Sequence, residues 1–524
     1  MKKRTLALRE PNECLTGLWR CVPGYIRLTF SSAFVLGLLV HLYMFANKFT
    51  NHDDLNQMFY ADYGTASGRW LLPPVLRLDG NISVPWLIGV LSVLCLAGVA
   101  CVTVSLLRIR RPAGCILTAA LVVSFPTVTA TFGYMFSADA YFLSLLMAVS
   151  GAYAAVKWGW RGSVLAVVLI TLSLSIYQGY LPVAAVLMVG ALLLETLDGE
   201  RSFRELFLKG LRLLATLLAA LAAYMLSVRL TTFRTGLPLT DYEGISDMGK
   251  ISLADLPRLI AASYRKHVDF FLKNDWNCQF DFLKYAFLLT GLGCLAIGAM
   301  LLLRRRLGPA RTALAAALAA VYPLAGALIY VMVPNGYIHI HMLYGLVYIL
   351  IAPIALMEYA LPEFQRDRTL HAAVSWVVLL TMTLTSYSYA VTANNAYMKA
   401  DLGMRQCAAY SNRLLERIES CEGYRQGMDV VLVGSNIRED ALRPTPEADT
   451  AWLVGIFDMG NLRTYFTYRN FLRFYLGFTD PVFTGDSETA RNFAATEQVQ
   501  GMPLYPEAGS VQVIEGSVVV KLNE

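Results

Sequence analysis

Residues 84–107 read VPWLIGVLSVLCLAGVACVTVSLL, a run of 24 residues that contains no charged side chain. A bilayer has a hydrocarbon core about 30 Å thick, and a helix needs about 20 consecutive apolar residues to cross it. The run is therefore long enough and apolar enough to cross a membrane once. It predicts a transmembrane helix.

Similar runs recur along residues 28–393. Of the 524 residues, 56% are hydrophobic and only 16% are charged, and the mean hydropathy is +0.49; an average soluble chain has about 25% charged residues. The sequence therefore predicts an α-helical polytopic membrane protein with about eleven transmembrane helices. The predicted spans are 28–46, 84–107, 113–131, 139–156, 163–177, 181–197, 211–231, 285–303, 312–333, 342–360 and 372–393. The spans at 163–177 and 181–197 form either a tight helical hairpin or one broken helix.

Basic residues occur at every second connection between these spans. Their clusters are Lys2/Lys3/Arg4, Arg108/Arg110/Arg111, Lys157/Arg161, Arg201/Arg204/Lys209/Arg212, Arg304/Arg305/Arg306/Arg311 and Arg366/Arg368. Because positively charged connections stay in the cytoplasm, residues 1–27 are predicted to be a cytoplasmic leader. An odd number of spans then places residues 394–524 outside, together with the loops at 47–83 and 232–284. This topology explains the net charge of +6, so nucleic acid is not an expected partner.

The composition changes after the transmembrane domain at residues 28–393. Residues 394–524 have the polar mixture of a soluble fold. An amphipathic helix is predicted near 400–419, a buried strand at 429–434 and a β-hairpin at 511–522. These elements predict a small C-terminal extracytoplasmic domain of the α/β or α+β class.

The first outer loop contains Asn51-His52-Asp53-Asp54-Leu55-Asn56 and, further on, Ser67-Gly68-Arg69-Trp70. Paired acids directly after a span cost free energy unless they are solvated or paired, so Asp53 and Asp54 are expected to face a water-filled cavity at the outer mouth. A carboxylate there can act as the general base for a sugar hydroxyl, and the planar guanidinium of Arg69 can bind a phosphate. The alternative is a solvated loop in which Asp53 or Asp54 caps a short helix.

Asp139 is the only charged residue between Arg111 and Lys157. It stands at the outer end of a predicted span, where it either caps the helix or completes an acidic site with Asp53 and Asp54. Two or three carboxylates can also hold a divalent cation such as Mg²⁺ or Mn²⁺. The sequence leaves the need for a metal open.

Other outer loops carry polar and aromatic side chains that fit either a sugar or the aromatic belt of a membrane interface. Tyr177 and Gln178 lie between two spans, and His339 and His341 lie before another. Two histidines without a third ligand are weak evidence for a metal site; hydrogen bonding to substrate, or simple placement at the membrane interface, are the alternatives. Together with Trp70, these residues are the candidates for binding the sugar or its acceptor.

The large outer loop contains LADLPRLIAASYRKHVDFFLK at 253–273, with apolar residues at helical spacing. It predicts a helix that lies either at the bilayer interface or against the outer surface of the bundle. Arg265 and Lys266 of this segment are candidates for holding a lipid-linked phosphate. The alternative is a general attraction to anionic headgroups.

The acidic pair outside the first span, followed by Ser67-Gly68-Arg69-Trp70-Leu71, resembles the bacterial membrane glucosyltransferases of the Gtr type II family. Asp139 with Tyr141 is the second match. The arrangement of spans is similar to the wider GT-C class of glycosyltransferases, which have a multi-span bundle, an acidic first outer loop and often an outer soluble domain. The resemblance covers most of the membrane part, and nothing in the tail matches.

The resemblance implies transfer of a sugar, expected to be glucose, from a polyprenyl-phosphate donor to a cell-surface glycan outside the bacterial cytoplasmic membrane. In that reaction Asp53 or Asp54 is the base, Asp139 orients the acceptor or shares the base role, and Arg69, with Arg265 or Lys266, stabilises the departing phosphate. One alternative is a transporter or flippase of lipid-linked sugar, which would place ionisable residues near the bilayer midplane and repeat its broken helices in two halves. Another is a non-enzymatic envelope protein whose tail binds a partner.

Overall fold

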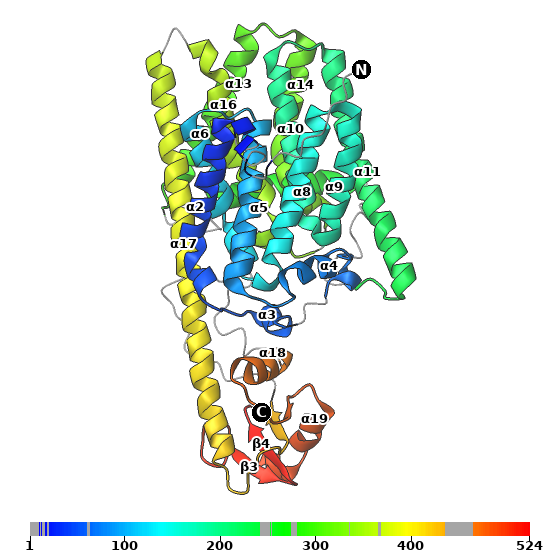
Figure 1. The fold of residues 1–524 in the computed structure, drawn as a ribbon, viewed down its shortest axis with the longest axis vertical. Coiled ribbons are helices and arrows are strands. Elements are labelled where there is room, and N and C mark those ends of the chain that lie inside the picture. Colours follow the sequence, from blue (N-terminus) through cyan, green and yellow to red (C-terminus); the bar gives the residue numbers. More distant parts are fainter. Residues whose placement is uncertain are drawn as a thin grey trace.

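The computed structural model describes residues 20–59, 63–240, 254–273, 280–334, 336–364, 368–434 and 465–523, together with the single positions 10, 12, 16, 17 and 252. Within this part of the chain the fold is a helical bundle with a small mixed domain at one end (Figure 1). The long helices of the bundle are α2 (Gly24–Ala46), α5 (Pro85–Leu106), α8 (Ala138–Lys157), α9 (Gly159–Ile176), α10 (Leu181–Asp198), α11 (Phe203–Thr235), α13 (Leu283–Arg304), α14 (Pro309–Gly326), α16 (Val347–Ala360) and α17 (Arg368–Glu419).

Among the described residues, nine helices are long and apolar enough to cross a membrane, or ten if one bent pair counts as a single span. This confirms a polytopic helical protein, but not the expected count of about eleven spans. α9 and α10 both belong to the nine and are joined only by η4 (Gln178–Tyr180), so the expected pair at 163–177 and 181–197 is a hairpin of two helices. The expected span at 312–333 is not among the nine, and it is divided into α14 and the short α15 (Ile329–Met332).

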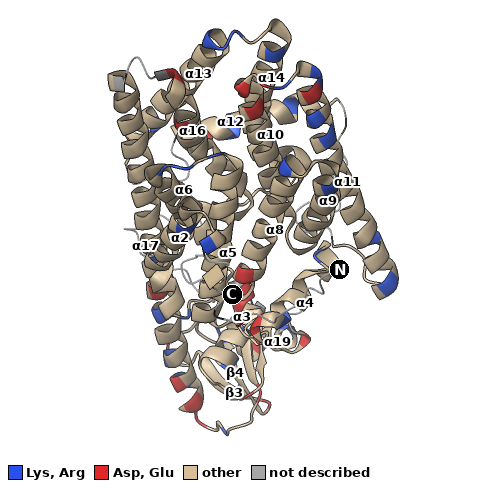
Figure 2. Ribbon diagram, turned by 45° about the horizontal axis from the view of Figure 1, so that its top comes forward, with Lys and Arg blue, Asp and Glu red and all other residues tan. Residues whose placement is uncertain are grey.

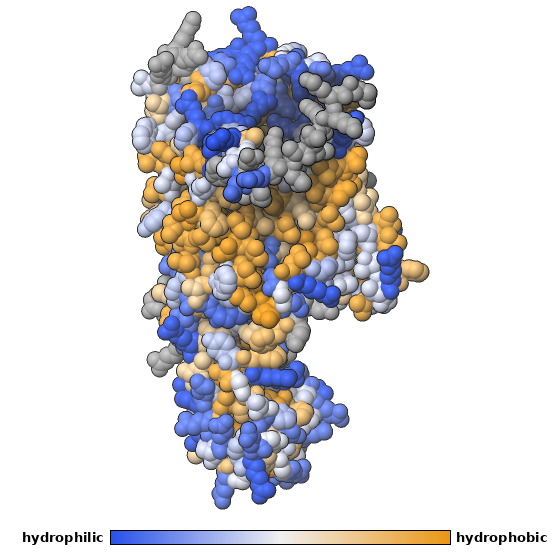
Figure 3. All heavy atoms as spheres, viewed as in Figure 1, coloured by the Kyte–Doolittle hydropathy of each residue, from blue (hydrophilic) through white to orange (hydrophobic). Residues whose placement is uncertain are grey.

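The surface of the bundle has the pattern of a membrane protein. Hydrophobic residues form a belt between a hydrophilic end and the C-terminal domain (Figure 3). Lys and Arg gather on the connections at the end remote from that domain, and α11 carries further basic residues at its other end (Figure 2). A contiguous exposed apolar belt of this kind suits lipid rather than water.

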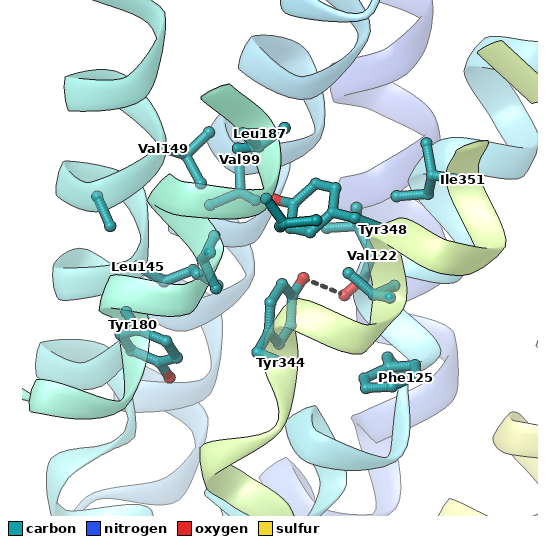
Figure 4. Packing of buried hydrophobic residues seen from close by; sticks show 14 of the residues in the cluster. Val99, Val122, Phe125, Leu145, Val149, Tyr180, Leu187, Tyr344, Tyr348 and Ile351 are labelled. Atoms are coloured by element: carbon teal, nitrogen blue, oxygen red, sulfur yellow. Dashed lines mark hydrogen bonds between the residues drawn. The ribbon is translucent and has the colours of Figure 1, made fainter. Parts of the chain in front are cut away.

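A broken helix crosses the interior of the bundle. α6 (Pro112–Ser124) and α7 (Pro126–Phe132) meet at a bend of 40°. Pro126 has no N–H, so the Val122 carbonyl loses its usual helical partner. The Tyr344 hydroxyl replaces it by donating to the Val122 oxygen at 2.8 Å (Figure 4). Inside a bilayer such a carbonyl must be satisfied by protein, and Tyr344 does this.

Replacing Tyr344 with phenylalanine is expected to lower the free energy of unfolding by about 1–2 kcal/mol, because the buried Val122 carbonyl loses its donor while the ring keeps its packing. Thermal unfolding of the detergent-purified protein measures the change as a drop in Tm. The matched control is Tyr387→Phe, since Tyr387 is 58% exposed on the outside of the bundle. Equal Tm values for the two variants would refute this role for Tyr344.

α17 connects the bundle to the C-terminal domain. Its 52 residues form one continuous helix, about 78 Å long at 1.5 Å per residue, which is far more than a bilayer core requires. The helix therefore crosses the apolar belt and continues beyond it, along one edge of the molecule (Figure 1).

In the C-terminal domain, the described residues form a four-stranded sheet in the order β2-β1-β4-β3. Its strands are β1 (Val430–Val433), β2 (Val482–Phe483), β3 (Val511–Ile514) and β4 (Ser517–Lys521). β1 pairs in parallel with β2 and β4, and β3 and β4 form the hairpin expected at 511–522. The short helices α18 (Tyr465–Asn470), η11 (Phe471–Tyr475), α19 (Glu488–Ala494) and α20 (Glu497–Gln500) accompany the sheet in the described part of the domain.

Candidate functional site

The first loop, between α2 and α5, lies at the end of the bundle that faces the C-terminal domain (Figure 1). It contains the short helices α3 (His52–Asn56) and α4 (Leu72–Leu76), with the turn η1 (Thr65–Ser67) between them. Gly68 ends this turn in the left-handed region at φ 77°, and a Cβ there would lie 2.7 Å from the Tyr224 hydroxyl. Only glycine fits both conditions, so the turn can press against α11 and present Arg69.

Arg69 lies at the centre of a cluster built from three other elements. Its Nη1 donates to the Tyr141 hydroxyl of α8 at 3.0 Å, and its Nε donates to Gln178 Oε1 of η4 at 3.2 Å. The guanidinium carbon lies 5.2 Å from the centroid of the Tyr177 ring, a cation–π distance. Gln178 in turn donates to the Tyr224 hydroxyl of α11 at 2.8 Å. The structure thus brings Arg69, Tyr177 and Gln178 together.

Trp70 is anchored beside this cluster. Its indole Nε1 donates to Ser227 Oγ of α11 at 2.9 Å. The Trp70 ring also packs against the main hydrophobic core. The residue therefore fixes the loop next to Arg69.

Aromatic rings extend the cluster away from Arg69. The rings of Tyr141 and Tyr177 stack with their centroids 4.5 Å apart, and the ring centroid of His341 lies 5.9 Å from that of Tyr177. His339 and His341 stack on each other at 5.4 Å with nearly parallel rings. Burial lowers the pKa of His341 well below its ordinary value, and the neighbouring His339 and Arg69 act in the same direction. His341 is therefore a neutral hydrogen-bonding group at neutral pH.

The charge of Arg69 is not balanced inside this cluster. Its hydrogen-bonding partners are the hydroxyl of Tyr141 and the amide of Gln178, both neutral. In the part of the chain that the structure describes, no carboxylate pairs with it. A cation held among aromatic rings without a counter-charge favours an anionic ligand.

Asp54 does not face a water-filled cavity, as was expected from the sequence, because protein groups surround it. Its side chain is 0% exposed, and its carboxylate accepts from Lys48 Nζ at 2.6 Å, Ser83 Oγ at 2.6 Å and the Phe136 N–H at 3.2 Å. It therefore ties the first loop to the segment that precedes α8. The cap of α3 is Asn51, whose side chain accepts from the Asp54 N–H at 2.7 Å.

Asp53 and Asp139 are the more accessible carboxylates, and both are partly exposed. Asp139 lies in the first turn of α8 and accepts from the Ala140 N–H at 2.8 Å, while Ser137 occupies the N-cap position. Asp79, in the same loop as Asp53, interacts electrostatically with Asp139. Burial raises the pKa of Asp79. Asp79 was missed from the sequence, although its position shortly before the span at 84–107 was a usable signal.

The described residues contain no group of three or more His, Cys, Asp and Glu that could hold a metal ion. The pair formed by His339 and His341 has no third ligand of this kind within that part of the chain. The described residues therefore do not fit a Mg²⁺ or Mn²⁺ site built from such ligands.

Arg265 and Lys266 lie elsewhere in the large loop. Their helix, α12 (Leu256–Leu272), packs against α13, α14 and α15, so the segment lies on the bundle, one of the two expected arrangements. Both side chains are exposed, and Lys266 Nζ lies 4.0 Å from Asp269. Among the residues described, neither contacts Arg69.

A family model described as "Glucosyl transferase GtrII" matches residues 42–350. The match covers more than half of the chain and includes Asp53, Asp54, Asp139 and the whole Arg69 cluster. It ends before α17 and the C-terminal domain. No curated protein and no solved structure matches the chain.

Proposed function

Since the chain belongs to the GtrII glucosyltransferase family, we propose that it transfers glucose from a polyprenyl-phosphate donor to a cell-surface glycan, on the outer side of the bacterial cytoplasmic membrane. The family itself implies glucosyl transfer in the modification of surface glycans. The lipid-linked donor, the side of the membrane and the roles of individual residues are the proposal. They are supported by the geometry of the first loop.

The observation that carries the proposal is the uncompensated charge of Arg69. The guanidinium is flanked by Tyr141, Tyr177 and Gln178 and has no carboxylate partner among the described residues. A phosphate monoanion or dianion supplies the missing charge, and the planar guanidinium can hold it through parallel N–H···O bonds. Arg265 and Lys266, exposed on α12, are proposed to attract the anionic donor at a distance from this contact.

The proposed reaction is a direct displacement at the anomeric carbon. A carboxylate removes the proton of the acceptor hydroxyl as the new glycosidic C–O bond forms, and the bond from the anomeric carbon to the phosphate oxygen breaks. Polyprenyl phosphate leaves with the bonding electron pair, and the charge of Arg69 stabilises the negative charge that develops on it. We assign the base role to Asp53 rather than Asp54, because Asp54 is buried and paired with Lys48. Asp139 orients the acceptor or shares the base role.

The aromatic and polar groups near Arg69 are suited to bind a sugar between the guanidinium and the proposed base. We propose that Trp70, Tyr177 and the pair of His339 and His341 supply aromatic rings and ring nitrogens to a sugar, because sugars bind to both kinds of group. Gln178 is engaged by Arg69 and Tyr224. We therefore propose that the main role of Gln178 is to hold Arg69 in position, and that a contact with the sugar is a lesser role.

The distribution of basic residues supports an outer location for the first loop. The first loop and the C-terminal domain lie at one end of the bundle, and most of the basic connections lie at the other (Figures 1 and 2). By the positive-inside rule, the basic end is cytoplasmic. Nucleotide sugars are confined to the cytoplasm, so a site at the opposite end requires a donor carried by a lipid.

The test is a transfer assay with the purified, reconstituted full chain. Radiolabelled polyprenyl-phosphate glucose and a nucleotide-linked glucose are offered separately, each with a panel of surface glycans as acceptors. We expect label to reach a glycan only from the lipid-linked donor. Transfer from the nucleotide sugar, or no transfer from either donor, would overturn the proposal. Movement of the lipid-linked sugar across the vesicle membrane without transfer would instead identify a transporter.

A further inference from the structure

α3, the helix that carries Asp53 and Asp54, lies between the bundle and the C-terminal domain (Figure 1). It has five residues, too few to be stable through their own backbone hydrogen bonds. Its conformation must therefore be fixed by its neighbours. On the bundle side, Asp54 supplies the contacts to Lys48, Ser83 and the Phe136 N–H.

On its other side, α3 contributes to the core of the C-terminal domain. Leu55 of α3 is 0% exposed, and Met58, which follows shortly after the helix, is 8% exposed; both belong to a hydrophobic cluster that is separate from the main core of the bundle. The other buried members of this cluster include Met404, Cys407, Tyr410, Leu414, Val430, Tyr468, Phe471 and Leu472. All of these come from the far half of α17 or from the C-terminal domain. The cluster is therefore incomplete without α3.

A polar contact and an aromatic contact also join α3 and the residues after it to the C-terminal domain. Asn470, the last residue of α18, donates from Nδ2 to Asn56 Oδ1 at 2.6 Å. The rings of Phe59 and Phe474 meet edge to face at 5.4 Å. A hydrogen bond of defined direction sets the rotation of a short helix in a way that apolar burial alone does not.

We propose that the C-terminal domain positions the first loop. Asn470 acts as a positioning residue that orients α3 and thereby Asp53. The proposal rests on the function proposed above, because it assigns the domain a part in that reaction. Asp53 precedes Leu55 and Asn56 within one turn of α3, so the direction of its carboxylate follows the rotation that those residues impose. A displacement of about 1 Å at a reacting group can cost about 10²-fold in rate.

The test exploits the chemistry of an amide pair. A single Asn56→Asp or Asn470→Asp change keeps a donor opposite an acceptor, since the remaining amide can turn its NH₂ group toward the new carboxylate. The double variant N56D/N470D places two carboxylates against each other and loses the bond. Asn492→Asp, exposed on α19 of the same domain, is the matched control.

Two measurements are made on the full chain. The first is the transfer assay with polyprenyl-phosphate glucose. We expect kcat to fall at least about tenfold in N56D/N470D, with an unchanged KM for the donor, because the base moves while Arg69 stays in place. The second is hydrogen–deuterium exchange over residues 50–59, which is expected to speed up only in the double variant. The single variants and N492D are expected to match the wild type in both measurements.

The outcomes separate the two proposals. If the wild type transfers no glucose, the proposed function fails, and the exchange measurement still decides whether the domain orders α3. A double variant with wild-type exchange and wild-type kcat overturns the positioning role, as does an equal loss in each single variant. If N56D/N470D does not accumulate, Phe474→Ala removes the other contact from a residue that is already 37% exposed, and the same readouts apply.

Discussion

Replacing Arg69 with alanine is expected to lower kcat for glucosyl transfer by about 10²–10³-fold, the usual cost of removing one group that stabilises developing charge. The side chain is the one cation in its cluster of tyrosines, histidines and Gln178, as far as the described residues extend. No neighbour in that cluster can supply its charge. Initial rates measured over a range of donor concentrations give kcat and KM separately.

Arg69→Lys refines this prediction. Lysine keeps the positive charge but cannot make paired N–H···O bonds to a phosphate or stack on Tyr177, so only part of the rate is expected to return. The matched control is Arg77→Ala, because Arg77 lies in the same loop and is exposed. R69A with the activity of R77A would show that Arg69 does not contact the donor.

The two adjacent aspartates are expected to give opposite defects. Asp53→Asn should lower kcat by about 10²–10⁴-fold, the range for loss of a general base, while the Tm stays near that of the wild type because Asp53 is partly exposed. Asp54→Asn should instead destabilise the fold by about 3–5 kcal/mol, because Lys48 loses the buried carboxylate that balances it. Thermal unfolding and transfer rates on the same preparations separate the two effects.

Asp255→Asn, an exposed change at the start of α12, is the control for both variants. If D53N keeps the wild-type kcat, the base role does not belong to Asp53, and Asp139→Asn becomes the decisive variant. If D54N is as stable as D255N, the contacts of Asp54 with Lys48, Ser83 and Phe136 contribute little to the fold.

Hydropathy predicted several of the membrane helices closely, but not the number of spans. The runs at 84–107 and 139–156 correspond to Pro85–Leu106 and Ala138–Lys157. The hairpin expected at 511–522 also formed, with Glu515 and Gly516 in the left-handed region at its turn. These features depend on residues close together in the chain, through apolar length and turn chemistry, so a single sequence contains the information.

The roles of neighbouring charged residues could not be predicted in the same way. Asp53 and Asp54 follow each other in the sequence, yet one is partly exposed and the other is fully buried. Successive side chains on a helix point about 100° apart, so burial depends on which face meets the bundle. Lys48 and Ser83 hydrogen-bond to Asp54, and only the folded structure of the loop identifies them as its partners.

Apolar length and composition are sufficient to predict a helical membrane protein, and the short motifs of the first loop are sufficient to indicate the glucosyltransferase family. Tertiary structure alone showed that Arg69, Tyr141, Gln178 and His341 surround one site, and that α3 completes the core of the C-terminal domain. The two kinds of feature differ in how far apart along the chain the interacting residues lie. Lipid selects each span through its own apolar length, whereas a buried charge or a shared core depends on side chains that lie far apart along the chain.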